Sequence, residues 1–514
     1  MLGVTGRARR ALVLVATSLA AFTATLDNTV VAVALRDLQR DLDAGVAELQ
    51  GVVTAYTVAL AALLLSGGTL ADVAGRRRVL VSGLAVFAAA SAGCALSDTS
   101  TELIAWRAVQ GAGAALVLPG SLAVLAAAHP EPAARARAVG LWAATGAAAL
   151  LAGPLVGGLL VEASGWPAVF WVNLPLCAAV ALVTALAPAG PPAASGRRLD
   201  LPGQVLVAVG LAAGTYAVVL AGRDGLRWPV LASLLLAAAS LVAFAVVERR
   251  APDPVLPLGL LRRPTFTGAA LGAFAASLAV FVLLVFLSLF LQLVQQRGAL
   301  PAAVRLLPLT VGLVVVAPVA GRWAARGVRA PVVAGLLVAA AGLALVALRL
   351  RDDLGDVELA VLLGVCGVGL GLSTAPVVAA SLDAVSAARS GLAAATVNVA
   401  RELGGVVAVA GLGALVVARL GTDLTARLLD LGVPQGRAGV LVEALLRGAT
   451  QDEVVELSAG EVPFAALLVL RTAAEQSYVV SVRLALVGAA VVLAVSAGVC
   501  LRALRPGVDQ LDDA

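Results

Sequence analysis

Long apolar runs, separated by short arginine-bearing segments, dominate this sequence of 514 residues. Most runs match or exceed the roughly 20 residues that a helix needs to cross the hydrocarbon core of a bilayer. Lipid offers no partner for backbone polar groups, so only helices and closed barrels span it, and continuous apolar runs favour helices. The sequence predicts an all-α integral membrane protein with fourteen spans, at 11–35, 50–71, 78–97, 102–126, 137–161, 168–187, 201–221, 229–247, 266–294, 303–323, 330–349, 357–381, 391–418 and 480–503.

The charged residues support a membrane location and indicate an orientation. Charged residues make up only 13% of the chain, against about a quarter in soluble domains. The net charge of +5 comes from arginines in alternate short loops, and no basic stripe with interleaved aromatics points to nucleic acid. Because short basic loops stay on the cytoplasmic side, we expect both termini in the cytoplasm of a cell whose plasma membrane holds the chain.

Several chemistries have no support in the sequence. The four cysteines stand far apart inside apolar runs, without metal-ligand spacing or a disulfide framework. The chain has no lysine, so it cannot contain the lysine-bearing loop that cradles the phosphates of a nucleotide. We therefore expect no metal and no cofactor. The first apolar run imitates a secretory signal but is too long for one, which favours an uncleaved first span.

Two segments interrupt the regular alternation of spans and loops. PAGPPAASGRR, residues 188–198, has the composition of a cytoplasmic linker. The longer polar segment from about 419 to 478 is expected outside the cell. Within it, DLTARLLDLGV and AGVLVEALLRG have the pattern of short amphipathic helices resting on the outer surface.

Three segments of the first half carry motifs. GGTLADVAGRRRVL, residues 67–80, combines a tight turn with opposite charges that can pair across a closing interface, although its arginines also serve as topology signals. RAVQGAG, from residue 107, places Arg107 inside a span, where it needs a partner or a water-filled cavity unless it reaches the interface. GPLVGG, residues 153–158, joins a helix-bending proline to glycines that permit close helix approach, and a kink alone would also explain it.

In this order and on these spans, the three motifs resemble those of the major facilitator superfamily. Fourteen spans, with LDNTVVAVAL in the first, are similar to its fourteen-helix drug:proton antiporter branch. QLVQQRG, LLPLTVGL, APVAGR, GLGLSTAP and NVARELGG extend the resemblance through the second half. The chain departs from the pattern at Ala32, where the family has Asn, at Arg36, where it has Pro, and at Glu402, where Gln is common.

The resemblance implies the major facilitator fold, in which two six-helix bundles rock about a central site. The bundles would be 11–187 and 266–503, the second including the outer loop 419–478. Between them would lie the linker 188–200, an inserted helix pair at 201–247 and a cytoplasmic loop at 248–265. The resemblance also implies a functional monomer that exports lipophilic or cationic small molecules in exchange for protons.

The resemblance assigns roles to particular residues. A proton-coupled carrier needs a buried carboxylate that exchanges protons, and Asp27 is the candidate, with Arg107 as its electrostatic partner. Glu402 is either a further protonatable group or a charge that accompanies Arg401. The remaining candidates are the loop-motif residues Gly68, Asp72, Gly75, Arg76 and Arg77, the antiporter-motif residues Gly153, Pro154, Gly157 and Gly158, and the cavity liners Tyr56, Thr57, Trp142, Asn173, Gln292, Asn398, Arg401 and Glu402.

Other functions remain open on the sequence. A dedicated exporter of one native metabolite, antibiotic or lipid would have the same features. A membrane-embedded enzyme would need paired acids, a histidine cluster or an activated nucleophile, whereas the single histidine, His129, lies in a loop. A sensor would be expected to carry a signalling domain.

Overall fold

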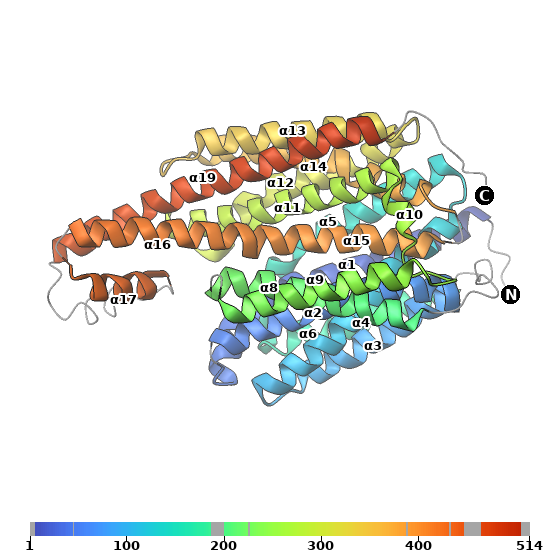
Figure 1. Ribbon diagram of the computed structural model, residues 1–514, viewed down its shortest axis with the longest axis horizontal. Coiled ribbons are helices and arrows are strands. Elements are labelled where there is room, and N and C mark those ends of the chain that lie inside the picture. The colour runs from blue at the N-terminus through green and yellow to red at the C-terminus, as the bar shows by residue number, and fades with distance from the viewer. Residues whose placement is uncertain are drawn as a thin grey trace.

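The computed structural model describes residues 6–44, 46–186, 200–224, 227–386, 389–430, 433–446 and 464–504. Over these ranges the chain is helical and contains no strand, which confirms the predicted all-α class. Most of the predicted linker at 188–200 lies outside the described residues. Figure 1 shows the helices lying side by side along the long axis of the molecule.

The first group of helices forms one bundle. Within it α4 packs against α2 and α3, and α1 packs against α5 and α7. The glycine- and alanine-rich faces of these helices allow the close packing that holds helices together in lipid. Its helices are α1 (Gly6–Asp41), α2 (Val46–Leu70), the π-helical turn η1 (Ala71–Gly75), α3 (Arg76–Ala95), α4 (Ser100–Ala128), α5 (Pro132–Ser164), the short α6 (Ala168–Trp171) and α7 (Asn173–Leu186).

The inserted pair, α8 (Leu201–Asp224) and α9 (Trp228–Glu248), packs together and is seen in green across the middle of the near face in Figure 1. α8 contacts α2 of the first bundle and η3 (Val407–Leu412), a π-helical segment of the second. α9 exposes leucine and valine side chains along its length, among them Leu234, Leu235 and Val242. Such a continuous apolar surface suits contact with lipid.

The second group forms the other bundle. In it α14 packs against α12 and α13, while α19 packs against α11 and α13. Its helices are the short α10 (Leu258–Leu261), α11 (Pro264–Leu293), α12 (Ala299–Ala324), α13 (Arg329–Arg349), α14 (Asp356–Asp383), α15 (Ser390–Val406), η3, α16 (Gly413–Asp430), α17 (Gln435–Leu446) and α19 (Phe464–Ala503).

Over the described residues, 12 helices are long and apolar enough to span a membrane, or 13 when the two parts of the bent α5 count as one span. One of the 12 is the stretch Glu48–Ala95, 48 residues long. It holds two predicted spans, α2 and α3. The chain turns between them at Gly75, the last residue of η1, where the backbone angle φ is 101°. Counting that stretch as two crossings gives the fourteen of the sequence prediction.

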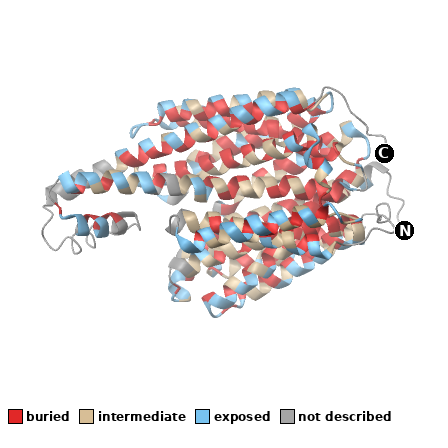
Figure 2. Ribbon diagram, in the orientation of Figure 1, coloured by how far each residue is buried: buried red, intermediate tan, exposed pale blue. Residues whose placement is uncertain are grey.

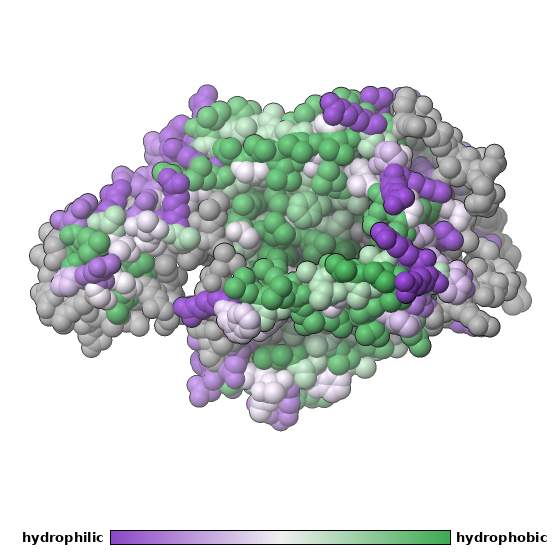
Figure 3. All heavy atoms as spheres, viewed as in Figure 1, coloured by the Kyte–Doolittle hydropathy of each residue, from purple (hydrophilic) through white to green (hydrophobic). Residues whose placement is uncertain are grey.

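The start of α1 and the end of α19 lie at the same end of the molecule, which we call the terminal end, and α17 lies at the far end (Figure 1). Buried residues are concentrated on the helix faces that meet inside the molecule (Figure 2). Figure 3 shows a broad hydrophobic band between two more hydrophilic ends. This is the surface expected of a protein that crosses a bilayer along its long axis.

The far end differs from the prediction. DLTARLLDLGV is not a separate helix on the surface, because its described part belongs to α16, which prolongs the line of α15 and η3 beyond the bundle (Figure 1). No proline interrupts the chain between Ser390 and Asp430, so the helix continues. The last helix begins at Phe464 rather than at about 480. Among the described residues of the predicted outer segment, α17 alone matches a short separate helix.

Candidate functional site

Asp27 of α1 and Arg107 of α4 form an ion pair inside the first bundle. Arg107 Nη1 lies 2.7 Å from Asp27 Oδ2, and the exposed fractions of the two side chains are 1% and 0%. The predicted contact between these residues is therefore present. Two charges removed from water are stabilised only when further hydrogen bonds satisfy their remaining donors and acceptors.

Polar side chains from α4 and from two more helices, α3 and α7, complete the network around Asp27. Gln110 Nε2 donates to Asp27 Oδ1 at 2.9 Å, and Asn173 Nδ2 donates to the same oxygen at 2.7 Å. Gln110 also donates to Ser91 Oγ at 2.7 Å and accepts from Arg107 at 2.6 Å. The network therefore joins α1, α3, α4 and α7, and all its members are buried.

Arg107 has additional partners that hold its guanidinium in place. Its Nε donates to the carbonyl oxygen of Val52 at 3.2 Å. The ring of Tyr56 lies 4.4 Å from the guanidinium carbon, and that of Phe170 lies 5.9 Å away. Aromatic faces attract a desolvated cation. The Tyr56 hydroxyl in turn donates to the carbonyl oxygen of Ala24 at 3.3 Å, beside Asp27 on α1.

The hydrogen bonds around Asp27 fit its ionised form. All three of its partners donate to it, and an ionised carboxylate is an acceptor only. Asn173 Oδ1 is buried without a hydrogen-bond partner among the described residues. Rotation of that amide would offer an acceptor to a protonated Asp27. The site can thus satisfy the ionised Asp27 carboxylate, and Asn173 could supply an acceptor for the protonated form of the same side chain.

Asp72 joins the two bundles at the terminal end. Its carboxylate accepts from the backbone N–H groups of Gly391 and Leu392 at 3.0 and 3.1 Å. These are the free donors at the start of α15, where the helix dipole favours an anion. Gly68, one turn earlier on α2, faces the backbone of Gly391 so closely that a Cβ atom would collide with it.

The other residues of the loop motif lie around Asp72. Arg76 Nε is 3.6 Å from Asp72 Oδ1. Arg77 donates to the carbonyl oxygen of Ala185 in α7 at 2.8 Å, which ties the loop to its own bundle. Gly75 occupies the left-handed backbone region that favours glycine.

A second connection between the bundles was not predicted as a site. Arg135, near the start of α5, forms an ion pair with Asp383, the last residue of α14. Arg135 is one of the short-loop arginines that the sequence analysis used only to indicate orientation. Ala136, Ala324 and Ala379 pack together beside this pair, so α5, α12 and α14 are in tight contact. Asp72 and Arg135 therefore each connect the two bundles at the terminal end.

α5 bends at the antiporter motif and packs against α1. Its segments Pro132–Leu150 and Leu155–Ser164 meet at 47°, and Gly153 and Pro154 lie at the break. A Cβ on Gly153 would collide with Thr29 of α1, and one on Gly157 would lie 3.2 Å from the carbonyl oxygen of Val30. Gly158 has nothing within 4 Å of such an atom.

The remaining predicted cavity residues do not join the Asp27 network. Buried Trp142 donates to Ser121 Oγ at 3.4 Å, and Gln292 and Asn398 bond within their own helices. Thr57 donates to the carbonyl oxygen of Val53 on its own helix at 3.2 Å. Arg401 and Glu402 are half-buried neighbours on α15. α15 packs against α2, the helix that carries Tyr56.

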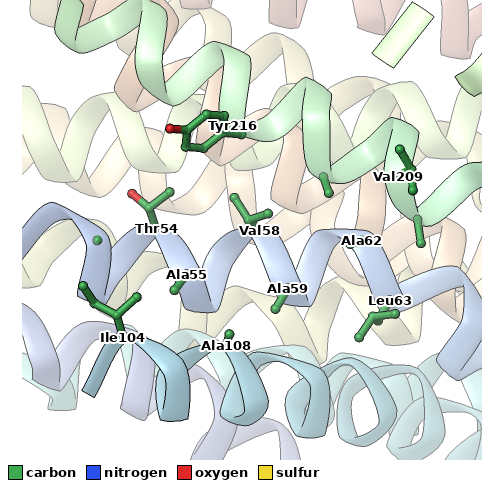
Figure 4. A pocket seen from close by; sticks show the side chains of 13 residues that line it. Thr54, Ala55, Val58, Ala59, Ala62, Leu63, Ile104, Ala108, Val209 and Tyr216 are labelled. Atoms are coloured by element: carbon green, nitrogen blue, oxygen red, sulfur yellow. The ribbon is translucent and has the colours of Figure 1, made fainter. Parts of the chain in front are cut away.

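A groove of about 570 Å³ runs between α2, α4 and α8 (Figure 4). Its lining is almost wholly apolar and built largely from alanines, with Thr54 and Tyr216 facing each other near one end. Apart from Tyr56 and Thr57, the predicted cavity residues lie on other helices, and none of the predicted set lines this groove. Over the described residues, no group of three metal-ligating side chains is present.

Gln110 and Ser91 were missed by the sequence analysis. Gln110 follows Arg107 by three residues within RAVQGAG, so the two share a helix face. That spacing was a usable signal. Ser91 offered none, because a serine in an apolar span is commonly satisfied by its own backbone, as Ser91 also is through the carbonyl oxygen of Phe87.

Comparison with known proteins identifies relatives over most of the chain. Residues 17–409 match the sequence model of the Major Facilitator Superfamily. The "Multidrug resistance protein Stp" of Mycobacterium tuberculosis is 34% identical over 443 residues, 85% of this chain and 82% of that protein. The "Tetracenomycin C resistance and export protein" of Streptomyces glaucescens is 32% identical over 487 residues, 93% of this chain and 88% of that protein.

A solved structure shares the fold. The proton:xylose symporter XylE, of the major facilitator superfamily, superposes with a TM-score of 0.58 at 14% identity, over 88% of this chain and 99% of that one. At this identity the likeness concerns the fold alone.

Proposed function

The chain belongs to the major facilitator superfamily, and we propose that it exports drugs or other lipophilic or cationic small molecules in exchange for protons. The observation that carries this proposal is the buried Asp27–Arg107 pair with its ring of donors. The names of the relatives support the class of substrate, since they describe multidrug resistance and antibiotic export. Transport would require no cofactor and no second subunit.

Asp27 would be the group that carries the proton. In its ionised form it links α1 to α4 through Arg107 and Gln110, and to α7 through Asn173. Protonation would remove the charge that Arg107 compensates and leave the guanidinium with weaker partners. The two helices would then be freer to move, which couples the proton to the rearrangement of the bundle. This coupling is the basis of exchange.

Alternating access would follow from the contacts at the terminal end. We propose that this end faces the cytoplasm, as its arginine-rich loops suggest. Two contacts would then close the transport path to the cytoplasm in this conformation. They are the hydrogen bond from the start of α15 to Asp72 and the ion pair between Arg135 and Asp383. Breaking both contacts would let the bundles rock and open the central site inward.

Proton-driven accumulation in proteoliposomes tests the proposal. With an imposed pH gradient and a lipophilic fluorescent cation as the probe, the native protein should accumulate the probe against its concentration gradient. Asp27→Asn should lose gradient-driven accumulation. Asp98→Asn, which changes an exposed aspartate, serves as the control. Accumulation by Asp27→Asn at the native rate would exclude Asp27 as the coupling acid, and a native protein indifferent to the gradient would exclude proton exchange.

A dedicated exporter of one antibiotic is the second candidate. It is favoured by a relative named for a single compound, tetracenomycin C. Efflux from cells that lack their major pumps, measured for a panel of unrelated lipophilic dyes and antibiotics, distinguishes the two. A broad exporter should protect against many compounds, whereas a dedicated one should protect against one chemical class.

A further inference from the structure

Two carboxyl groups meet at the terminal end of the inserted pair, away from the Asp27 network. Asp200 precedes α8, and its Oδ1 accepts from the backbone N–H of Gly203 at 3.0 Å. Glu248 is the last residue of α9, and its Oε1 accepts from the backbone N–H of Leu256. Glu248 is only 4% exposed. Each acid therefore uses one oxygen to cap nearby backbone.

The other oxygen of each acid faces the other carboxyl group. Asp200 Oδ2 and Glu248 Oε2 are both buried and have no hydrogen-bond partner among the described residues. A Cβ on Gly203 would collide with both atoms, so they converge on one point. The buried amide nitrogen of Gln204, one turn along α8, also has no partner within the described ranges.

Two ionised carboxylates cannot satisfy each other, because both are acceptors only. Neighbouring buried carboxylates also repel, so the ionisation of one opposes that of the other. One proton resolves both problems, since it turns one group into a donor and removes one charge. Among the described residues close to Glu248 in the sequence, the charged side chains are Arg249 and Arg250, which are exposed, and Asp253, which is half-buried in the following loop. Across the helix pair, the charge that acts on Glu248 is that of Asp200.

We propose that Asp200 and Glu248 bind one proton between them, and that this protonated pair clamps the connection from the inserted helices to the second bundle. Val255 and Leu256 of that connection are buried, and Glu248 holds the Leu256 amide. Loss of the proton would drive the carboxylates apart and release that amide. This proton site is separate from Asp27 and does not depend on the proposed transport function.

Hydrogen exchange of the peptide that contains Val255 and Leu256 tests the proposal on the full chain. Opening releases one proton, so after correction for the intrinsic rate the opening constant should rise by up to tenfold per pH unit between the pKa of the separated carboxyl groups and the pKa of the closed pair, and should level off above the latter. Protection is thus present at low pH and lost as the pH rises. Glu248→Gln supplies a permanent donor to Asp200, so this variant should stay protected at every pH.

Controls separate the proton from a merely structural role. Asp200→Asn, the reciprocal isostere, should behave like Glu248→Gln and covers the case in which one variant fails to fold. Glu131→Gln, at an exposed glutamate of the same end, should keep the native pH dependence. Infrared spectra should contain a protonated-carboxyl band that Glu248→Gln lacks. A native exchange profile independent of pH, or the same pH dependence in Glu248→Gln, would overturn the proposal.

Discussion

Asp27 and Arg107 stand 80 residues apart in the chain and 2.7 Å apart in the structure, where neither is exposed. Each charge is acceptable inside the bundle only because the other is there. The pair is therefore both a structural element, joining α1 to α4, and the place where a single proton changes the balance of charge. These two aspects can be measured separately.

We expect Arg107→Ala to destabilise the protein by about 3–5 kcal/mol, because it removes one partner of a buried ion pair and leaves the Asp27 carboxyl group without its cation. The double variant Asp27→Asn/Arg107→Gln removes both charges and should lose less stability than the single variant. Thermal unfolding in detergent measures the difference. Arg78→Ala, at an exposed arginine, is the reference, and an Arg107→Ala no less stable than this reference would contradict the assignment.

Gly153 and Gly158 allow a matched test of close packing between α5 and α1. A methyl group at Gly153 would overlap Thr29, so Gly153→Ala should cost about 1–3 kcal/mol through displacement of α1. The same change at Gly158 meets no atom within 4 Å and should be neutral or stabilising by up to about 1 kcal/mol, because alanine is the better helix former. Equal melting temperatures for the two variants would show that the bend does not depend on this approach.

In the Arg135–Asp383 pair, each charged side chain interacts unfavourably with the dipole of its own helix. Arg135 lies near the start of α5 and Asp383 ends α14, whereas helix dipoles favour anions at the start and cations at the end. We expect Arg135→Asp alone to open the terminal end by repulsion. The double exchange Arg135→Asp/Asp383→Arg should restore closure at least to the native level, since both charges then suit their helices.

Thiol labelling reports this opening. Ala379→Cys places a reporter in the buried alanine cluster between the bundles, and the four native cysteines are buried. Labelling should be about fivefold faster with Arg135→Asp, as expected for the loss of about 1 kcal/mol, and should return to the starting rate or below in the double exchange. Unchanged labelling in the single variant would mean that Asp72 alone keeps this end closed.

Much of the candidate site was predictable because lipid makes polar residues conspicuous. Asp27 and Arg107 stood out as charges inside apolar spans, and the loop motif singled out Asp72. The sequence offered less for Arg135 and Asp383, which lie at span ends where charges are ordinary. The same holds for Asp200 and Glu248, which belong to different helices and become a pair only when α8 packs on α9.

The sequence by itself determined that this chain is a set of membrane helices, because runs of apolar residues have no other stable form in lipid. It also determined which charges had to find partners. Only the tertiary structure decided which groups those partners are. Gln110 and Asn173 donate to Asp27, Gln110 also donates to Ser91, and the start of α15 donates to Asp72. Polar contacts between helices depend on the rotation of each helix about its axis and on the angle at which two helices cross. Small residues such as Gly68 and Gly153 influence both by allowing close approach. Neither quantity can be predicted from the hydropathy of the sequence.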